Sequence, residues 1–143
     1  MTNVAGQINE VIEDIFISLE KKERDYSEFK LNNQQYVLLT LIIRKNGITP
    51  SELAQQMSIT KSAVSQQLAK LEREGYIIRK QHAEDKRTVI IVLGEKGLQY
   101  KKEMEKFSKE ISKKYYAHLT KEQLHNMLET LQKLKNIIDD IEK

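Results

Sequence analysis

The segment Thr49–Gly75 constrains the fold most, because it predicts two helices separated by only three residues. The strongest helix start in the chain is Thr49-Pro50-Ser51-Glu52. Its threonine can cap the helix, its proline suits the first helical position, and its glutamate can complete a capping box. We expect one helix over Pro50–Met57, a break at Ser58–Thr60 and a second helix over Lys61–Glu74. This pattern is typical of a helix-turn-helix.

The residue pattern changes after Gly75. Two runs rich in β-branched residues, Ile77–Lys80 and Thr88–Leu93, predict a hairpin with a charged tip over Gln81–Arg87. The chain is rich in helix formers and has only 5 Gly and 1 Pro, which excludes an all-β sandwich. The predicted fold class is therefore mainly α with a small β-hairpin wing.

Apolar residues at helical spacing predict the other helices. These are expected from the N-terminus to about Arg24, from Asn33 to about Lys45 (apolar nearly all round), from Leu98 to about Leu119, and from Thr120 onward. Capping boxes are expected at Asn32 with Gln35 and at Thr120 with Gln123. The segment Asp25–Lys30 has no apolar stripe and is expected to bend.

Several protein classes are excluded by what the chain lacks. It has no cysteine, which rules out disulfides, thiol chemistry and Cys-ligated metals. The longest apolar run, Val37–Ile43, is far shorter than the roughly 18 residues of a membrane helix. The N-terminus has no basic region followed by an apolar stretch, as a secretory signal would. We expect a soluble, cytoplasmic chain.

At 143 residues the chain is about one domain long, and we divide it into two regions. Residues 31–97 are expected to form a winged helix-turn-helix DNA-binding domain, and residues 1–30 and 98–143 a helical dimerisation region. The terminal apolar stripes are too long for a winged helix of about 65 residues to cover. They either pack on each other within one subunit or interleave with a second copy. The geometry favours a homodimer, whose two recognition helices would lie about 34 Å apart.

The second helix of the helix-turn-helix is the candidate recognition helix. We expect Val64, Leu68 and Leu71, which recur at helical spacing, to face the core. The exposed arc then offers short polar groups to base edges: glutamine can pair with adenine, serine can donate or accept, and alanine can meet a thymine methyl. The candidate base-facing residues are Ser62, Ala63, Ser65 and Gln66. The phosphate candidates on this helix are Lys61, Lys70 and Arg73.

The hairpin adds a second cluster of basic side chains. Its candidates for phosphate or groove contacts are Arg79, Lys80, His82, Lys86 and Arg87. Arg87 is expected in the minor groove, whose negative potential favours a guanidinium. Asp85 is expected to orient Arg87 or a neighbouring basic side chain by a charge-assisted bond. Alternatively, the hairpin only covers an edge of the core and its charges serve solubility.

Charge is unevenly distributed along the chain. Residues 1–30 carry four basic and seven acidic side chains, whereas residues 60–90 carry seven basic and four acidic ones. The two balances are therefore −3 and +3. This asymmetry predicts that only the middle of the chain meets a polyanion.

The order of these elements resembles the multiple-antibiotic-resistance regulator (MarR) family of bacterial winged-helix repressors. The resemblance covers essentially the whole chain. It is carried by the segments Ile48–Ala54, Lys61–Ser65, Leu71–Arg79, Glu84–Arg87 with its Asp-x-Arg pattern, and Leu93–Gly97.

The resemblance implies that Ser62, Ser65 and Gln66 face bases and that Arg87 reaches the minor groove. It also implies a homodimer and a small aromatic or lipophilic effector bound between the dimer helices and the winged domain. The chain departs from the family in two respects. Gly94 stands where the family usually has threonine, and glycine has no side chain with which to cap the next helix. The absence of cysteine excludes the peroxide-sensing branch.

We find no pattern that predicts catalysis or a cofactor. No phosphate-binding glycine loop, catalytic triad order or paired carboxylates occur, so we expect no enzyme. His118 and His125 straddle a helix break without an i, i+4 partner, which is a weak metal signal. Two pairs of aromatic residues are alternative candidates for lining an effector cleft: Tyr36 with Phe16, or Tyr115 with Tyr116. At helical spacing such residues are more often part of the core.

The leading prediction is a homodimeric, sequence-specific transcriptional repressor on a near-palindromic operator, and the family resemblance adds an effector to its partners. One alternative is a non-specific architectural DNA binder, whose affinity would depend almost wholly on salt. The other is a protein-interaction module whose winged helix does not bind DNA.

Overall fold

The structure is a computed structural model that describes residues 3–22 and 29–142. In chain order, its elements are α1 (Val4–Lys22), α2 (Asn33–Arg44), α3 (Pro50–Met57), α4 (Lys61–Arg73), β1 (Ile77–Gln81), β2 (Val89–Leu93), α5 (Glu95–Lys114), the short 3-10 helix η2 (Tyr116–His118) and α6 (Lys121–Ile141). The predicted fold class, mainly α with one hairpin, is confirmed.

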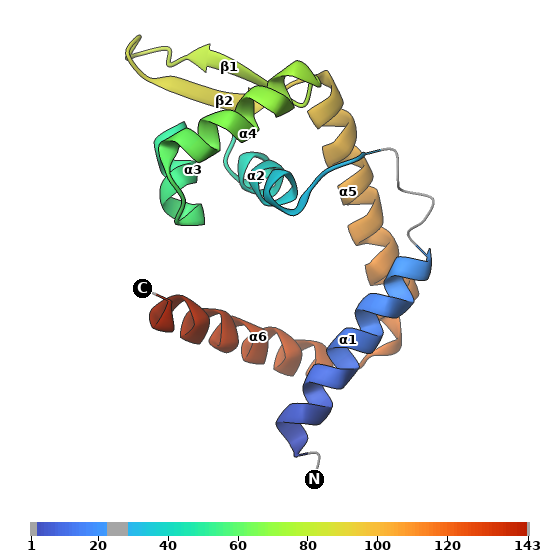
Figure 1. The fold of residues 1–143 in the computed structure, drawn as a ribbon. Coiled ribbons are helices and arrows are strands. Elements are labelled where there is room, and N and C mark those ends of the chain that lie inside the picture. The colour runs from blue at the N-terminus through green and yellow to red at the C-terminus, as the bar shows by residue number, and fades with distance from the viewer. Residues whose placement is uncertain (1–2, 23–28, 143) are drawn as a thin grey trace.

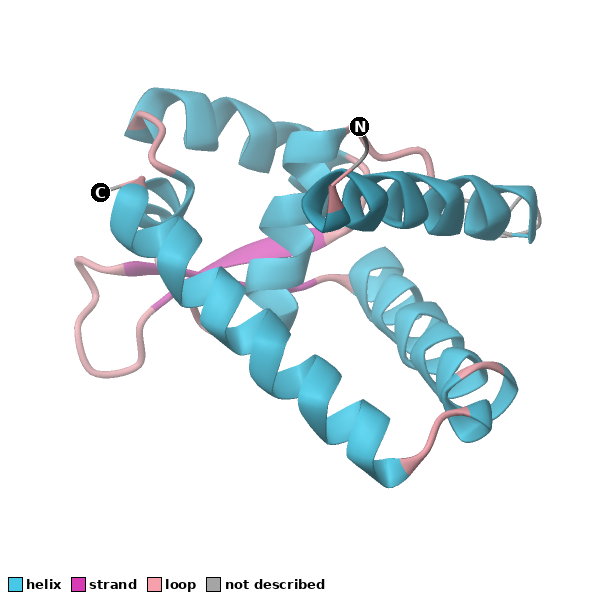
Figure 2. Cartoon of the chain, turned by 90° about the horizontal axis from the view of Figure 1, so that it is seen from below, coloured by secondary structure: helices cyan, strands magenta, loops and turns pink. Residues whose placement is uncertain are grey.

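The elements gather at two ends of an elongated molecule. Helices α2, α3 and α4 and the hairpin form one end, and α5 leads from them to the other end, where α1 and α6 lie (Figure 1). Seen from below, the hairpin lies far from the turn that joins α5 to α6 (Figure 2).

A single apolar core lies inside the hairpin end. The three residues predicted to face inward from α4, namely Val64, Leu68 and Leu71, are fully buried. They pack in one cluster with other buried side chains, which are Leu38, Leu39, Ile42, Ile48, Leu53, Ala54, Tyr76, Ile77, Ile91 and Tyr100. Burial of a side chain of this size contributes about 1.5–3 kcal/mol. The helix-turn-helix therefore has a closed core of its own.

Helix α2 is less buried than its apolar sequence predicts. Leu38, Leu39 and Ile42 are buried, but Tyr36 is 54% exposed and Val37 is 40% exposed. A helix at the edge of a small core can bury only one face. The apolar residues of α2 are therefore buried on one face and exposed on the other.

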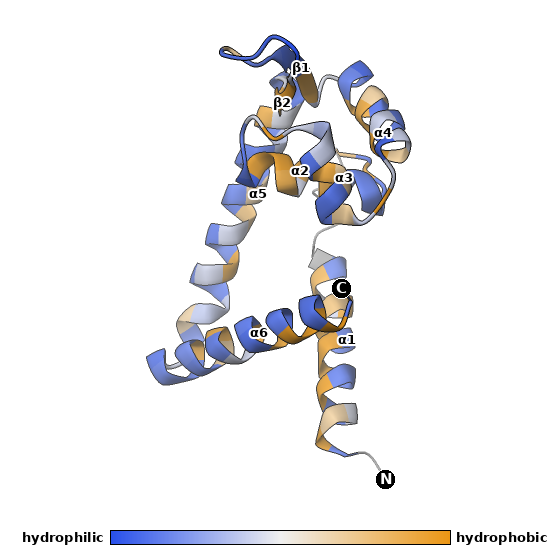
Figure 3. Cartoon of the chain, turned by 90° about the vertical axis from the view of Figure 1, so that its left-hand side faces the viewer, coloured by the Kyte–Doolittle hydropathy of each residue, from blue (hydrophilic) through white to orange (hydrophobic). Residues whose placement is uncertain are grey.

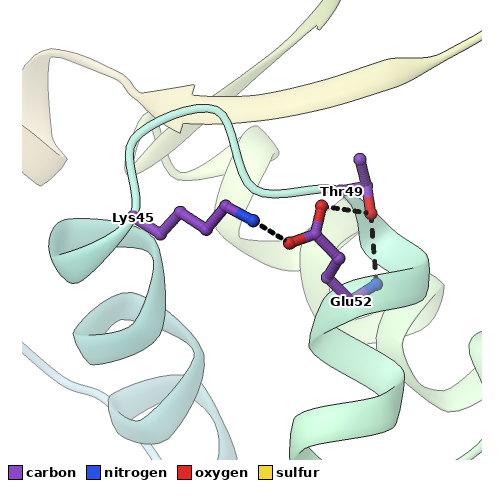
Figure 4. Close-up of polar contacts among 3 residues, drawn as sticks. All are labelled: Lys45, Thr49 and Glu52. Atoms are coloured by element: carbon purple, nitrogen blue, oxygen red, sulfur yellow. Dashed lines mark hydrogen bonds and ion pairs between the residues drawn. The ribbon is translucent and has the colours of Figure 1, made fainter.

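The predicted caps are observed, with one difference. Both capping boxes, at Asn32 with Gln35 and at Thr120 with Gln123, are present. Thr49 Oγ1 accepts a hydrogen bond from Glu52 N at 3.1 Å. The Glu52 carboxylate also accepts from Thr49 Oγ1 at 3.2 Å and pairs with Lys45 (Figure 4). Its bond with the Thr49 backbone is the smallest of the contacts that lower the pKa of Glu52, so Lys45 rather than the cap backbone is its main partner.

Lys45 stands at the end of α2, so its bond with Glu52 joins α2 to α3. A carboxylate binds an ammonium group more strongly than a neutral N–H, which explains the choice of partner. The bond to Lys45 also lowers the pKa of Glu52, and Thr49 adds to the effect against a smaller opposing desolvation.

The hairpin is antiparallel and is tied to the rest of the core at its base. Its register pairs Ile77 with Leu93 and Gln81 with Val89. Ile91 also bridges to Ile48, since Ile91 N donates to Ile48 O at 2.8 Å. The strands are therefore fixed to the loop between α2 and α3, while the tip extends beyond the core.

Helix α5 differs from prediction at both ends. It begins at Glu95 rather than Leu98 and ends at Lys114, so the segment up to Leu119 is not continuous helix. Gly94 is the N-cap without a side-chain bond, which agrees with the missing threonine. A Cβ on Gly97 would overlap the carbonyl oxygen of Tyr76, so this glycine permits close packing rather than breaking the helix.

The start of α5 is fastened to the end of the recognition helix by backbone bonds. Gly94 N donates to Tyr76 O at 2.8 Å, and Lys96 N donates to Gly75 O at 3.1 Å. Phe29, Tyr76 and Tyr100 add aromatic contacts, with ring centroids 5.4 Å apart for Phe29 and Tyr100. Burial raises the pKa of Tyr100 to about 12.

The terminal helices bury none of their described side chains. Apolar residues recur along both (Figure 3), and those of α6 include Leu128, Leu131 and Ile138, which are about half exposed. Helix α1 ends at Lys22, and the predicted end at Arg24 lies outside the described residues, as does most of the predicted bend at 25–30.

Candidate nucleic-acid interface

The turn between α3 and α4 sets the position of the recognition helix. Ser58 has left-handed backbone angles (φ 54°, ψ 41°), which reverse the chain directly after α3. Ile59 N then donates to Ala54 O at 3.2 Å, and Thr60 Oγ1 accepts from Ala63 N at 3.0 Å. These bonds satisfy the end of one helix and the start of the next. The predicted three-residue break is confirmed, and its last residue, Thr60, caps α4.

Most of the candidate DNA contacts on α4 are exposed. Its buried stripe points into the core, and the side chains that remain on the outer face are Lys61, Ser62, Ser65, Gln66, Lys70 and Arg73. Ala63 is half-buried. Short polar groups therefore occupy the first turns of a helix whose opposite face is fixed in the core.

Arg79, on β1, contacts α4 instead of projecting freely from the hairpin. Its Nη2 donates to Ser65 O at 3.3 Å, and its Nε lies 3.8 Å from Glu72 Oε1. The sequence analysis grouped Arg79 with the phosphate-contacting residues. It did not predict the contact with Ser65, because Ser65 lies 14 residues earlier in the chain and on another element. The guanidinium joins the wing to the recognition helix.

A cleft of about 380 Å³ separates α4 from the hairpin. Lys61 and Ser65 line it from the helix, and Arg79, Lys80 and Gln81 line it from the first strand. Candidate DNA-contacting residues from the helix and the wing thus face a shared groove.

The hairpin tip is a folded loop rather than an open one. His82 N donates to Thr88 O at 2.8 Å, and Thr88 N donates to Asp85 O at 3.0 Å. Lys80, Lys86 and Arg87 are exposed around it. The tip therefore presents three cations from a hydrogen-bonded scaffold.

Asp85 does orient Arg87, but not in the predicted way. The sequence predicted a charge-assisted bond to a basic side chain. Instead, Asp85 Oδ1 accepts from the backbone N–H of Arg87 at 3.0 Å, and Oδ2 accepts from Thr88 Oγ1 at 3.1 Å. An aspartate that bonds the backbone two residues later forms an Asx turn, a local alternative that the spacing allows. The Arg87 guanidinium is thus not bound by this carboxylate.

His82 also has a role that the sequence did not indicate. Its Nδ1 accepts from Glu84 N at 3.1 Å and from Asp85 N at 3.3 Å. A nitrogen that accepts hydrogen bonds carries no proton, so in this geometry His82 is a neutral acceptor. The predicted positive contact with phosphate does not fit this arrangement.

A second, mainly apolar cavity of about 560 Å³ lies at the opposite end of the molecule. It is lined by α1, the end of α5, η2 and the start of α6, and Tyr115 and Tyr116 are among its residues. Tyr36 and Phe16 are not in its lining, and Phe16 is 68% exposed. Of the two aromatic pairs considered for an effector cleft, only Tyr115 and Tyr116 line this cavity.

Neither a metal centre nor a membrane helix is found in the described part of the chain. Within residues 3–22 and 29–142, no three His, Asp or Glu side chains are grouped so that they could hold a metal ion. No helix in those ranges combines the length and apolar character needed to cross a bilayer.

The recognition helix is fixed in the core, exposes a polar face and lies beside a basic hairpin. These are the features of a DNA-binding transcriptional regulator of the winged helix-turn-helix type. A family model described as "MarR family" matches residues 31–89. The predicted resemblance to this family is thus confirmed over the winged-helix region of the chain.

Individual relatives agree with this assignment. The uncharacterized HTH-type transcriptional regulator YdgJ of Bacillus subtilis is 29% identical over 116 residues, which cover 78% of this chain and 68% of that protein. A Bacillus cereus regulator of the same type is 39% identical over 69 residues, covering 48% of this chain and 45% of its own length. Streptococcus pneumoniae FabT, solved in complex with DNA, has the same fold (TM-score 0.77, 24% identity, 94% of this chain and 97% of FabT). Both Bacillus relatives are described as HTH-type transcriptional regulators.

Proposed function

We propose that the chain is a homodimeric transcriptional repressor of the bacterial cytoplasm that reads a near-palindromic operator. The observation that carries this proposal is the outer face of α4, where exposed short polar residues lie directly opposite a fully buried stripe. A helix held in this way can enter the major groove without losing its support.

The residues of the interface divide by chemistry. Short polar and small groups suit base edges, and we assign this role to Ser62, Ala63, Ser65 and Gln66. Cations at the rim suit phosphates, and we assign this role to Lys61, Lys70, Arg73, Lys80 and Lys86. Arg87 is exposed at the tip and is assigned to the minor groove. Arg79 is assigned to hold the wing against α4.

The terminal helices support the homodimer. Their apolar residues form exposed stripes, and a stable monomer rarely leaves contiguous apolar surface of this extent in water. On α6, the spacing of Leu131, Leu134 and Ile138 matches a helix-pairing seam. We therefore assign residues 1–30 and 98–143 to dimerisation and residues 31–97 to DNA binding.

A two-fold dimer would present two α4 helices to one duplex. Successive major-groove faces lie about 34 Å apart, so the operator would contain two related half-sites at that spacing. A lone winged helix would bind a single half-site more weakly, because linking two modules raises the affinity through effective concentration.

The distal cavity supports a small aromatic or lipophilic effector. Its volume lies within the roughly 300–1,000 Å³ range of ligand sites, and its lining is mainly apolar with the polar groups of Asp14, Tyr115 and Tyr116. Because α1, α5 and α6 all contribute to the lining, a bound molecule would bias the arrangement of the helices that separate the two α4 copies. An effector that binds one arrangement of these helices more tightly than another would thereby change the affinity for DNA.

The test is selection of binding sites from a random duplex pool, together with sedimentation of the free protein. We expect an enriched motif with two inverted half-sites about ten base pairs apart and a sedimenting dimer. A pool that shows no enrichment, with affinity set only by salt, would identify a non-specific binder. A pool that is not retained at all would identify a protein-interaction module, and a monomer in sedimentation would refute the dimer.

A further inference from the structure

The tip of the wing is built around one imidazole. Residues 82–88 connect β1 to β2, and the His82 ring turns inward over this loop. Its Nδ1 accepts from two successive backbone N–H groups, those of Glu84 and Asp85, at 3.1 Å and 3.3 Å. The side chain of His82 therefore does what an Asx side chain does in a tight turn.

The same loop fixes the residues assigned to DNA. Asp85, whose N–H is bound by His82, in turn accepts from the backbone N–H of Arg87 at 3.0 Å. A chain of bonds thus runs from the His82 ring through Asp85 to Arg87. Moving the ring would remove the acceptor of the Glu84 and Asp85 N–H groups and loosen the backbone that presents Lys86 and Arg87, while the bonds between Asp85 and Thr88 would remain.

Protonation of the ring is incompatible with this arrangement. An imidazolium carries a proton on both nitrogens, so its Nδ1 becomes a donor that faces two other donors. Imidazole groups change charge between about pH 5 and 8, which is the range in which this conflict would arise.

We propose that His82 is a positioning residue of the wing, which holds Lys86 and Arg87 in their DNA-binding conformation only while its imidazole is neutral. This inference rests on the proposed function, because it concerns the presentation of the wing to DNA. It predicts that acidification loosens the tip and weakens binding. A phosphate-contacting His82 would show the opposite dependence, because an imidazolium attracts the duplex.

Neighbouring charges act on the ring with both signs. Glu84 and Asp85 on the tip are anionic, whereas Lys80, Lys86 and Arg87 on the same hairpin are cationic. The charged residues that line the cleft from α4 and from β1, which are Lys61, Arg79 and Lys80, are also cationic. A matched variant is therefore needed to separate the His82 effect from the general effect of pH.

Two substitutions separate the acceptor from the charge. In His82→Asn, the amide Oδ1 lies as many bonds from Cβ as Nδ1 does, so it can accept the same two N–H groups and cannot be protonated. In His82→Gln, the side chain is longer by one methylene, and its polar atoms occupy the place of Nε2 instead. Both variants are neutral, and a thermal melt checks that each one folds, which is expected since the tip lies outside the core.

The first measurement needs no DNA. Nitrogen-15 shifts of the imidazole report which ring nitrogen is protonated, and amide exchange reports the Glu84 and Asp85 N–H groups. At about pH 7.5 we expect the proton on Nε2 and slowed exchange at both amides in the wild type and in His82→Asn, but fast exchange in His82→Gln. A proton on Nδ1, or equal exchange in all three proteins, would overturn the proposal.

The second measurement is affinity for the duplex selected by the wild-type chain. At about pH 7.5 we expect His82→Asn to bind within twofold of wild type and His82→Gln about tenfold more weakly, the loss expected for two backbone bonds. At about pH 5.5 the wild type should fall toward the His82→Gln level while His82→Asn keeps its affinity.

A wild type that binds more tightly in acid than His82→Asn would overturn the proposal in favour of a phosphate contact. If the wild type selects no duplex at all, the proposed function fails, and the imidazole and amide measurements still decide whether His82 holds the tip.

Discussion

The helices of the winged-helix region and the terminal helices contain similar shares of apolar residues. These residues are largely buried in the first region and exposed in the second. In α2, α3 and α4, leucine and isoleucine side chains such as Leu38, Leu53 and Leu68 have no exposed surface. In α1 and α6, no described side chain is buried, and Val4 and Ile141 are more than 70% exposed. Both kinds of helix follow the 3–4 pattern of an amphipathic helix.

The difference shows that an apolar stripe specifies a buried face without specifying what covers it. In the winged helix the covering elements lie close by in the sequence, and the core closes within one chain. In the terminal helices, by contrast, the rest of the chain leaves the apolar stripes of α1 and α6 exposed. The first region should therefore be stable in a single protomer, and the second should depend on its partner. The predictions that follow test that contrast.

The largest effect is expected from charges placed in the α6 stripe. The double variant Leu131→Glu/Leu134→Glu buries two carboxylates in the proposed seam, which costs several kcal/mol unless the helices separate. We expect sedimentation at micromolar concentration to change from dimer to monomer, and affinity for a two-half-site duplex to fall by more than about 100-fold.

Lys133→Glu is the matched control, because it places a carboxylate on the same helix outside the stripe, at an exposed position. It should leave the dimer intact. If the double variant sedimented as the wild type does, the terminal helices would not form the interface, and the contrast between the two regions would need another cause.

The second prediction concerns the core of the winged helix. Leu68→Ala removes a fully buried side chain from α4 and should lower the free energy of unfolding by about 2–5 kcal/mol. Leu128→Ala, on α6, removes a side chain that is 55% exposed in the protomer. In the monomeric double-variant background it should change that free energy by less than about 0.5 kcal/mol. Urea unfolding of the two proteins measures both, and similar losses would show that α6 packs within its own chain.

The fold was predictable from the sequence where it depends on neighbouring residues. Caps and apolar spacing are local, and they gave α3 without error and α4 to within one residue at its end. They failed at the start of α5, because Gly94 and Gly97 are required by a contact with Gly75 and Tyr76 and not by a break in the helix. A glycine that permits close packing looks the same in the sequence as one that ends a helix.

The candidate site was predictable in its outline but not in its internal bonds. The exposed face of α4 follows from the position of its buried stripe. By contrast, the contact of Arg79 with Ser65 depends on how the hairpin folds back over α4. The roles of His82 and Asp85 depend on the backbone path of a seven-residue loop, which residue type alone does not determine. Charge patterns indicate which residues gather at a surface, and backbone geometry decides which of them are free to bind.

The third prediction tests the exposed side of α4. Gln66→Ala should cost about 1–3 kcal/mol on the selected duplex and nothing on a random duplex, because it removes a base contact. Lys70→Ala should weaken binding to both duplexes equally and reduce the salt dependence, because it removes a phosphate contact. Titrations of both variants on both duplexes at two salt concentrations measure this. Equal losses for Gln66→Ala on the two duplexes would contradict direct readout by this side chain.

The smallest effect is expected at the surface joint between α2 and α3. Lys45 lowers the pKa of Glu52, so this pair stabilises the folded state above the ordinary pKa of 4.5, and the contribution is lost as the pH falls through the lowered value. Since the side chains are 59% and 36% exposed, the contribution at neutral pH should not exceed about 0.5 kcal/mol. Glu52→Gln should remove it, so that the difference in unfolding free energy between wild type and variant shrinks as the pH is lowered from 7 toward 3. A difference that is constant over this range would show that the Glu52 charge adds nothing to the joint, and that the Thr49 cap and the buried Leu53 and Ala54 hold α3 in place.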